Sequence, residues 1–307
     1  MYWTYEDAII FYPEFNDKLD LELLCNYKKI IFSNYTFNEG LYKYLYENYK
    51  INYLFSVINN EWYPLINKFN QPIDELPQSI THLILNGCFN QPVDVLPQSI
   101  THLTFNGHFN QPVNVLPQSI THLSLNGCFN QSVDMLPTFI TYLTLGLNGC
   151  FNQPVNMLPK SITHLTFGIQ FNQPIDELPQ SITHLTFGYG FNQQINLSNQ
   201  IVYLNLNSNN KYLIDNLPHG IKELEFNSGF DLELNNLPNS IEKISFNESS
   251  QYNQELNCLP NFVELIKLPS YYNKQIKKFP TKLKKIICDE NYKYIDDLKN
   301  FIIVTYS

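Results

Sequence analysis

The chain of 307 residues contains no arginine and a single alanine, Ala8. Arginine supplies the planar guanidinium group that contacts phosphate or guanine through two hydrogen bonds at once. Its absence argues against nucleic acid as a partner. Long hydrophobic runs are also lacking, so we expect no segment that spans or inserts into a membrane.

Basic residues are missing from the beginning of the chain, and paired cysteines are missing throughout. The first residues, MYWTYEDAIIFYPEF, carry acidic side chains where a signal peptide carries basic ones. The six cysteines include no C-x-x-C spacing of the kind that binds zinc. Both features favour a cytoplasmic protein whose thiols stay reduced.

Nearly identical short segments fill most of the chain. Residues 89 to 108 read FNQPVDVLPQSITHLTFNGH, and the next twenty read FNQPVNVLPQSITHLSLNGC. One apolar position marks eleven such units: Ile80, Ile100, Ile120, Ile140, Ile162, Ile182, Ile201, Ile221, Ile241, Val263 and Leu283. The period of about twenty residues matches the shortest leucine-rich repeats. Their strand pattern L-x-x-L-x-L is represented here by Ile100, Leu103 and Phe105. The sequence therefore predicts stacked coils that share one core.

Two prolines in each regular unit determine what lies opposite the strand. Pro97 and its counterparts restrict the preceding leucine to extended or polyproline geometry, and a second proline, such as Pro92, stands four residues before that leucine. Together they exclude a convex helix. The predicted fold is a leucine-rich-repeat-like horseshoe with a parallel β-sheet on the concave face, extended or polyproline convex segments, and little helix outside the N-terminal region.

An asparagine follows the repeated phenylalanine in every regular unit. Its side-chain amide could satisfy backbone groups at the turns, because buried N–H and C=O groups need partners. The alternative is a turn residue that tolerates unusual φ values. We favour a stacked ladder formed by Asn90, Asn110, Asn130, Asn152, Asn172 and Asn192.

Alternation along the strand THLTF turns Leu103 and Phe105 inward and His102 and Thr104 toward the concave face. Stacking predicts one column of His82, His102, His122, Tyr142, His164, His184 and Tyr203. A second column contains Thr104, Ser124, Thr166 and Thr186. These columns could bind a protein segment, since rigid amphipathic rings make good interface anchors. Alternatively, the histidines are copied consensus without a role at each position.

Stacked imidazoles would oppose one another's protonation, so we expect the histidine column to be neutral at pH 7. The regular units offer no neighbouring Cys, Asp or Glu to complete a zinc site, and the acidic residues Asp94 and Asp176 belong to the convex side. We therefore expect no metal, no cofactor and no catalytic residues, and the protein is not predicted to be an enzyme.

The motif F-N-x-P-[IV], at residues 69–73, 89–93, 109–113 and 171–175, followed by L-P-x-S-I-T-x-L-x-F, resembles the FNIP repeat family. That family is related to leucine-rich repeats and occurs mainly in social amoebae and large DNA viruses of amoebae. For a viral protein, the expected location would be the cytoplasm of the host cell. Ser132 and Gln194 replace the motif proline. The resemblance implies a protein-interaction scaffold with a partner of unknown identity.

The predicted organisation has three parts: a cap at 1–66 with possible early repeats, eleven repeats over 67–290, and a cap at 291–307. Some family members carry an F-box ahead of the repeats, which would make the protein a substrate receptor of a ubiquitin ligase. Residues 14–32, EFNDKLDLELLCNYKKIIF, have a faintly similar apolar rhythm but lack the expected Leu-Pro opening. An irregular cap is the alternative. The oligomeric state is not predicted.

Three local features complete the sequence-based expectations. Lysines gather between Lys274 and Lys285, either for an anionic partner or as a solvated end-cap. The unit containing LTLGLNGC is two residues longer than its neighbours, and we assign the extra residues to Gly146 and Leu147. Cys88 and Cys128 share one place two coils apart, about 10 Å from one another, which is too far for a disulfide.

Overall fold

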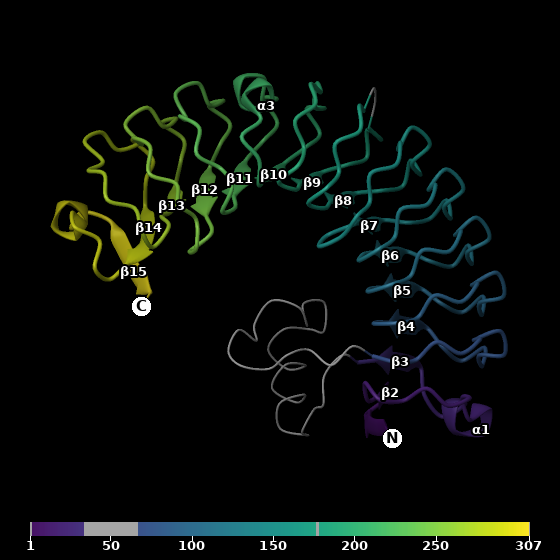
Figure 1. Cartoon of the computed structure of the whole chain (residues 1–307). Helices are drawn as coiled ribbons and strands as arrows, with labels where there is room; N and C mark the ends of the chain where they lie inside the picture. The colour runs from purple at the N-terminus through teal and green to yellow at the C-terminus, as the bar shows by residue number, and fades with distance from the viewer. Residues whose placement is uncertain (1, 34–66, 176–177, 307) are drawn as a thin grey trace.

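The computed structural model describes residues 2–33, 67–175 and 178–306. These residues form an arc of stacked coils in which the strands line the inner side and the connecting segments lie outside (Figure 1). The horseshoe predicted from the repeat is confirmed, with its parallel sheet on the concave face.

A single sheet of fifteen strands runs through the arc, in the order of the sequence. Strand β1 (Tyr2–Tyr5) pairs antiparallel with β2 (Ala8–Phe11), and every later pair is parallel. The strands that follow are β3 (Lys29–Phe32), β4 (His82–Leu85), β5 (His102–Phe105), β6 (His122–Leu125), β7 (Tyr142–Leu145), β8 (His164–Phe167), β9 (His184–Phe187), β10 (Tyr203–Leu206), β11 (Glu223–Phe226), β12 (Lys243–Phe246), β13 (Leu265–Lys267), β14 (Lys285–Asp289) and β15 (Ile302–Tyr306).

Each regular strand buries alternate side chains, because successive residues point to opposite faces of a sheet. In β5, Leu103 and Phe105 are 1% and 0% exposed, whereas His102 and Thr104 are half-buried on the other face. The core continues through phenylalanine rings that stack from coil to coil. Phe89 and Phe109 have ring centroids 6.0 Å apart, and Phe109 and Phe129 6.1 Å apart. No coil could bury these rings alone, so the core depends on stacking.

The convex segments of the regular coils are extended, as their prolines predict. Described helices are limited to α1 (Leu21–Leu24), α3 (Lys211–Asp215) and the 3-10 turn η1 (Ile295–Leu298). Helix α3 lies on the convex side of the arc (Figure 1), so the exclusion of convex helix was wrong for this coil. The helix can form here because this segment, NSNNKYLIDNLP, lacks the first proline of the motif.

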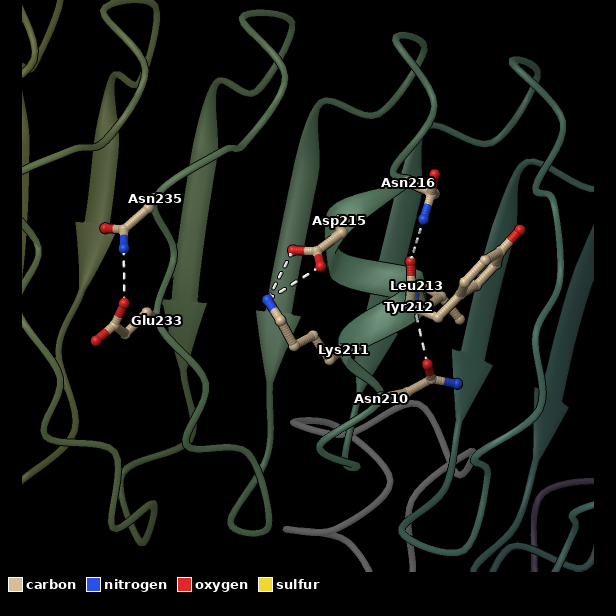
Figure 2. A network of polar contacts seen from close by, with 8 residues as sticks. All are labelled: Asn210, Lys211, Tyr212, Leu213, Asp215, Asn216, Glu233 and Asn235. Atoms are coloured by element: carbon tan, nitrogen blue, oxygen red, sulfur yellow. Dashed lines mark hydrogen bonds and ion pairs between the residues drawn. The ribbon is translucent and has the colours of Figure 1, made fainter.

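Polar side chains cap helix α3 in the coil where the motif proline is missing. The Asn210 side chain accepts a hydrogen bond from the Leu213 N–H at 3.1 Å, which satisfies one donor at the helix start. Lys211 Nζ lies 3.0 Å from Asp215, and Asn216 Nδ2 donates to the Tyr212 carbonyl at 2.8 Å. Figure 2 shows these contacts around the helix, beside the separate pair Asn235 and Glu233 of the next convex segment. This single turn of helix is therefore closed at both ends.

The N-terminal residues contribute to the sheet. Strand β3 contains Ile30 and pairs directly with β4 across a long separation in sequence. Within residues 14–32, the part weighed as an F-box, the structure places the four-residue helix α1 and strand β3. The rest of the predicted cap, residues 34–66, lies outside the described residues. At the other end, β15 within the expected cap 291–307 adds a further parallel strand.

The longer unit keeps its register with one shift from the sequence-based assignment. Gly146 N donates to the Leu125 carbonyl at 2.7 Å, just as Asn126 N donates to the Phe105 carbonyl at 2.9 Å. Cys150 N donates to Gly127 O, as Cys128 N donates to Gly107 O. Gly146 therefore has a counterpart in the preceding coil, and the extra residues are Leu147 and Asn148. Leu147 N reaches the Asn126 side chain at 3.0 Å, which anchors the bulged loop.

Candidate functional site

Strand register brings the predicted ring column together on the concave face. His82 pairs with His102, and His102 with His122, as direct neighbours in the sheet. Ring centroids are 4.1 Å apart for His82–His102, His102–His122, Tyr142–His164 and His164–His184, and 4.3 Å apart for His122–Tyr142. Tyr203 ends the column at 5.6 Å from His184. The rings cover one another's faces and leave their edges toward the groove.

The threonine before each histidine fixes the orientation of its ring. The Thr101 hydroxyl lies 2.9 Å from His102 Nδ1, and the same contact recurs at His82, His122, His164 and His184. The Thr101 hydroxyl also lies 3.2 Å from the Thr81 carbonyl, which already accepts the N–H groups of Thr101 and His102. Because a carbonyl oxygen has two lone pairs, we assign the hydroxyl proton to Nδ1 and the ring proton to Nε2.

Burial and neighbouring charge keep these rings neutral. Burial, followed by the charge of His82 and then Lys29, lowers the pKa of His102 to about 4. Burial, followed by the charge of His102, lowers the pKa of His122 to about 4. The pKa of His164 is about 4 for the same two reasons, with His184 as the nearest charge. Sequence reasoning named only repulsion between the rings, whereas burial is the larger cause.

The second predicted column lies beside the rings. Thr104, Ser124, Thr166 and Thr186 are half-buried and present hydroxyl groups on the same face, with Thr144 of β7 between Ser124 and Thr166. Asn205 closes this column and is 8% exposed, with its Nδ2 3.3 Å from the Tyr203 hydroxyl. The Tyr203 hydroxyl donates to Glu225 at 2.7 Å. From β4 to β10 the outward-facing strand residues are therefore uncharged, and all of them except Ile84 are polar.

Charges begin where the histidines end, at Lys29 of β3 on one side and at β11 on the other. Glu223 of β11 and Lys243 of β12 continue the ring column and form an ion pair at 3.0 Å. Lys267 of β13 pairs with Glu248 at 2.8 Å. The concave face thus consists of a neutral hydrogen-bonding half and a half made of paired charges.

The stacked rings do not converge on a metal position. Parallel imidazoles direct their nitrogen lone pairs side by side, whereas zinc needs ligands that point at one centre from about 2.0 Å. Across residues 2–33, 67–175 and 178–306, no group of three or more His, Cys, Asp or Glu is arranged to hold a metal ion. The nitrogen Nδ1 faces a hydroxyl, so the arrangement can donate hydrogen bonds from Nε2.

The predicted asparagines form a row at the rim. Asn110 N donates to Asn90 Oδ1, Asn130 N to Asn110 Oδ1 and Asn152 N to Asn130 Oδ1, each at 2.9 Å. The row continues through Asn172 and Asn192 with the same distance. Glutamine side chains bridge the same coils, since Gln111 Nε2 donates to the Asn90 carbonyl at 3.0 Å. These asparagines are half-exposed or exposed, so solvent also reaches the groups that they satisfy.

A second asparagine row, which sequence reasoning missed, is more deeply buried. Asn106 Nδ2 donates to Asn86 Oδ1 at 2.7 Å, and Asn126 Nδ2 donates to Asn106 Oδ1 at 3.0 Å. Asn86 and Asn106 are 5% and 7% exposed. Their Asn-Gly dipeptides indicate a turn, and that signal hid the role of the side chain. The repetition of Asn directly after the strand was the available clue.

In the part of the chain that the structure describes, no helix is long and apolar enough to cross a membrane. No curated protein matches the chain. A solved structure described as the crystal structure of CroV588, a novel circular LRR protein, is similar at 30% sequence identity and a TM-score of 0.63. The match covers 99% of this chain and 48% of that chain, so this chain spans about half of its neighbour's length.

A family model described as the FNIP repeat matches seven overlapping segments. They are residues 69–108, 89–128, 109–148, 129–170, 151–190, 171–209 and 209–249. Together the segments cover more than half of the 307 residues, including all strands from β4 to β12.

Proposed function

Because the chain belongs to the FNIP repeat family, we propose that it is a protein-interaction scaffold whose partner binds along the concave face of β4 to β10. The chain is a repeat solenoid of the leucine-rich type, an architecture that generally presents extended concave binding surfaces. The observation that carries the proposal is the unbroken column of His and Tyr rings on that face.

The chemistry of the column favours a partner rich in hydrogen-bond acceptors. With Nδ1 occupied by threonine, each histidine has one Nε2–H donor left, and the described residues provide no acceptor for it. The hydroxyls of Thr104, Ser124, Thr166 and Thr186 lie alongside. A protein segment that brings carbonyl, amide or carboxylate oxygens could satisfy these donors, and the rings lose little conformational entropy on binding.

The role proposed here is binding without catalysis, in the cytoplasm. General acid–base chemistry usually needs a group that orients the imidazole and tunes its pKa toward neutrality. Here the orienting group is a threonine hydroxyl, and the pKa values of His102 and His122 are shifted away from neutrality.

The test is capture of a partner followed by a matched pair of surface variants. Affinity purification from native cells and mass spectrometry would identify candidates, and titration calorimetry would measure binding. Thr104→Lys combined with Ser124→Lys places two ammonium groups in the groove and should weaken binding by about tenfold or more. Asn114→Lys, an exposed change on the convex segment of the same coil region, should leave the affinity unchanged. A convex variant that loses binding, with the concave variant unaffected, would overturn the proposal.

A further inference from the structure

A column of backbone contacts aligns one rim position across four consecutive coils. Gly87, Gly107, Gly127 and Gly149 stack so closely that a Cβ on Gly127 would lie 2.2 Å from the Gly107 oxygen, and one on Gly149 would lie 2.1 Å from the Gly127 oxygen. Such contact allows no side chain. The residues that follow the four glycines directly therefore share one place in the solenoid.

Those four residues are Cys88, His108, Cys128 and Cys150. Hydrogen bonds fix the same alignment. Each of these residues donates its N–H to a backbone carbonyl in the preceding coil, and that carbonyl belongs to the residue just before the aligned one. The distances are 2.8 Å for His108 to Gly87, 2.7 Å for Cys128 to Gly107 and 2.9 Å for Cys150 to Gly127. The two-residue loop ends before Gly149, so Cys150 returns to register beside Cys128.

The spacing of the coils at this place suits a disulfide. Adjacent parallel strands lie about 4.8 Å apart. The rings of Phe129 and Phe151, the next residues along the chain, have centroids 6.1 Å apart. The Cα atoms of Cys128 and Cys150 therefore fall within the range of about 4.4 to 6.8 Å that disulfides use.

Cys128 and Cys150 are both free and exposed, so an oxidant can reach both thiols. The other cysteines lack such a partner at the same place in a neighbouring coil. Cys88 is flanked at this place by Lys68 and His108, while Cys288 is buried and burial raises the pKa of its thiol. Cys25 follows helix α1, and Cys258 lies on a convex segment.

We propose that Cys128 and Cys150 form a redox-responsive disulfide that links two adjacent coils at the rim of the concave face. With hydrogen peroxide as the oxidant, one cysteine attacks a peroxide oxygen as its thiolate and breaks the O–O bond. The leaving hydroxide takes up the proton that the thiol lost, which gives a sulfenic acid and a water molecule. The second thiol then displaces the sulfenic oxygen as water and forms the S–S bond. A dithiol reductant returns both cysteines to thiols by exchange. The bond would tie the rim that carries the Leu147–Asn148 loop to its neighbour, just past the C-terminal ends of β6 and β7.

The experiment uses the full chain, first reduced and then treated with hydrogen peroxide. Remaining thiols are alkylated, and the digest is analysed by mass spectrometry. We expect one intramolecular link between Cys128 and Cys150, alkylation of the other four cysteines, and reversal by a dithiol. The melting temperature should be higher for the oxidised protein than for the reduced protein, because the link restricts the unfolded chain.

Matched variants separate the pair from general oxidation. Cys128→Ser and Cys150→Ser should each abolish the link and make the melting temperature insensitive to peroxide, whereas Cys88→Ser should change neither result. His108→Cys tests the register independently, since it places a thiol between Cys88 and Cys128 and should link to one of them. Recovery of Cys128 and Cys150 as separately alkylated or over-oxidised residues, or linked between two molecules, would overturn the proposal.

Discussion

The histidines of the concave face show how one residue can serve the fold and still be available for binding. Each ring stacks on its neighbours and takes a hydroxyl on Nδ1, so its position is set by the coil before any partner arrives. Burial makes the charged form unfavourable, and a second charge 4.1 Å away adds to that cost. Neutrality is therefore part of the packing of this column.

The first prediction concerns the titration of these rings. The pKa values of His102, His122 and His164 are about 4 in the folded protein and 6.5 in the ordinary state. Between these values the unfolded chain binds more protons than the folded chain, so the column makes stability fall as pH drops from 6.5 toward 4. Proton NMR of the ring signals should give depressed pKa values. His102→Gln should reduce the pH dependence of the melting temperature in this window, and independent titration near 6.5 would contradict the stacking.

The second prediction compares the two asparagine rows. Asn106→Ala removes a buried acceptor for Asn126 and a buried donor to Asn86, and should cost about 1 to 3 kcal/mol of unfolding free energy. Asn110→Ala removes one acceptor at the half-exposed rim, where water can replace it, and should cost about 1 kcal/mol or less. Thr104→Ala is the control, expected within about 0.5 kcal/mol. Denaturant unfolding would measure the cost of all three substitutions. Equal costs for Asn106→Ala and Asn110→Ala would contradict the expectation that the more buried row contributes more to stability.

At the scale of the element, the coil was predictable because its determinants repeat. Ile100, Leu103 and Phe105 identify the strand, and the prolines identify the extended return. Helix α3 was not predicted, because it occurs in the coil that departs from the motif, and its cap at Asn210 is a local hydrogen bond. The register of the long unit was misplaced by one residue for a similar reason. Alignment of the repeats could not show that the Gly146 N–H makes the same backbone hydrogen bond to the preceding coil as the Asn126 N–H.

The third prediction concerns the loop of that long unit. Leu147 and Asn148 are exposed and stand outside the register that Gly146 and Gly149 maintain. Deleting both should lower the melting temperature only slightly, since the neighbouring coils have no such residues. Deletion of Gly149 and Cys150 is the control of equal length, and it should be strongly destabilising because it places Leu147 where the stacked glycine stands, and a Cβ there meets the Gly127 backbone. Thermal unfolding followed by circular dichroism would compare them, and similar losses would show that the loop carries structural contacts.

At the scale of the whole molecule, the arc is divided by charge. Strands β4 to β10 carry neutral rings and hydroxyls, whereas the later strands carry lysines paired with glutamates, such as Lys243 of β12 with Glu223 of β11 at 3.0 Å. Exposed pairs of this kind add little to stability. Because these charges are paired, they produce little electrostatic field over the neutral half. Attraction of a partner there therefore depends on short-range hydrogen bonds and packing.

The fourth prediction follows from this division. A partner that binds the neutral half at pH 7 should show a dissociation constant that changes by less than about threefold between about 0.05 and 0.5 M salt, because few exposed charges are brought together. Binding to the charged half should weaken more over the same range. Calorimetry at several salt concentrations would distinguish them, and a steep salt dependence would move the site toward β11 to β14.

The close glycine contacts also bear on how such a chain changes over generations. Each regular coil meets its neighbours through the same few atoms: a glycine backbone, a phenylalanine face and a strand edge. A recombination event that duplicates or removes one whole coil reproduces all of these contacts, whereas an event that cuts a coil in two does not. Lineages of this gene should therefore differ in copy number by complete coils, with the breakpoints at equivalent positions of the repeat.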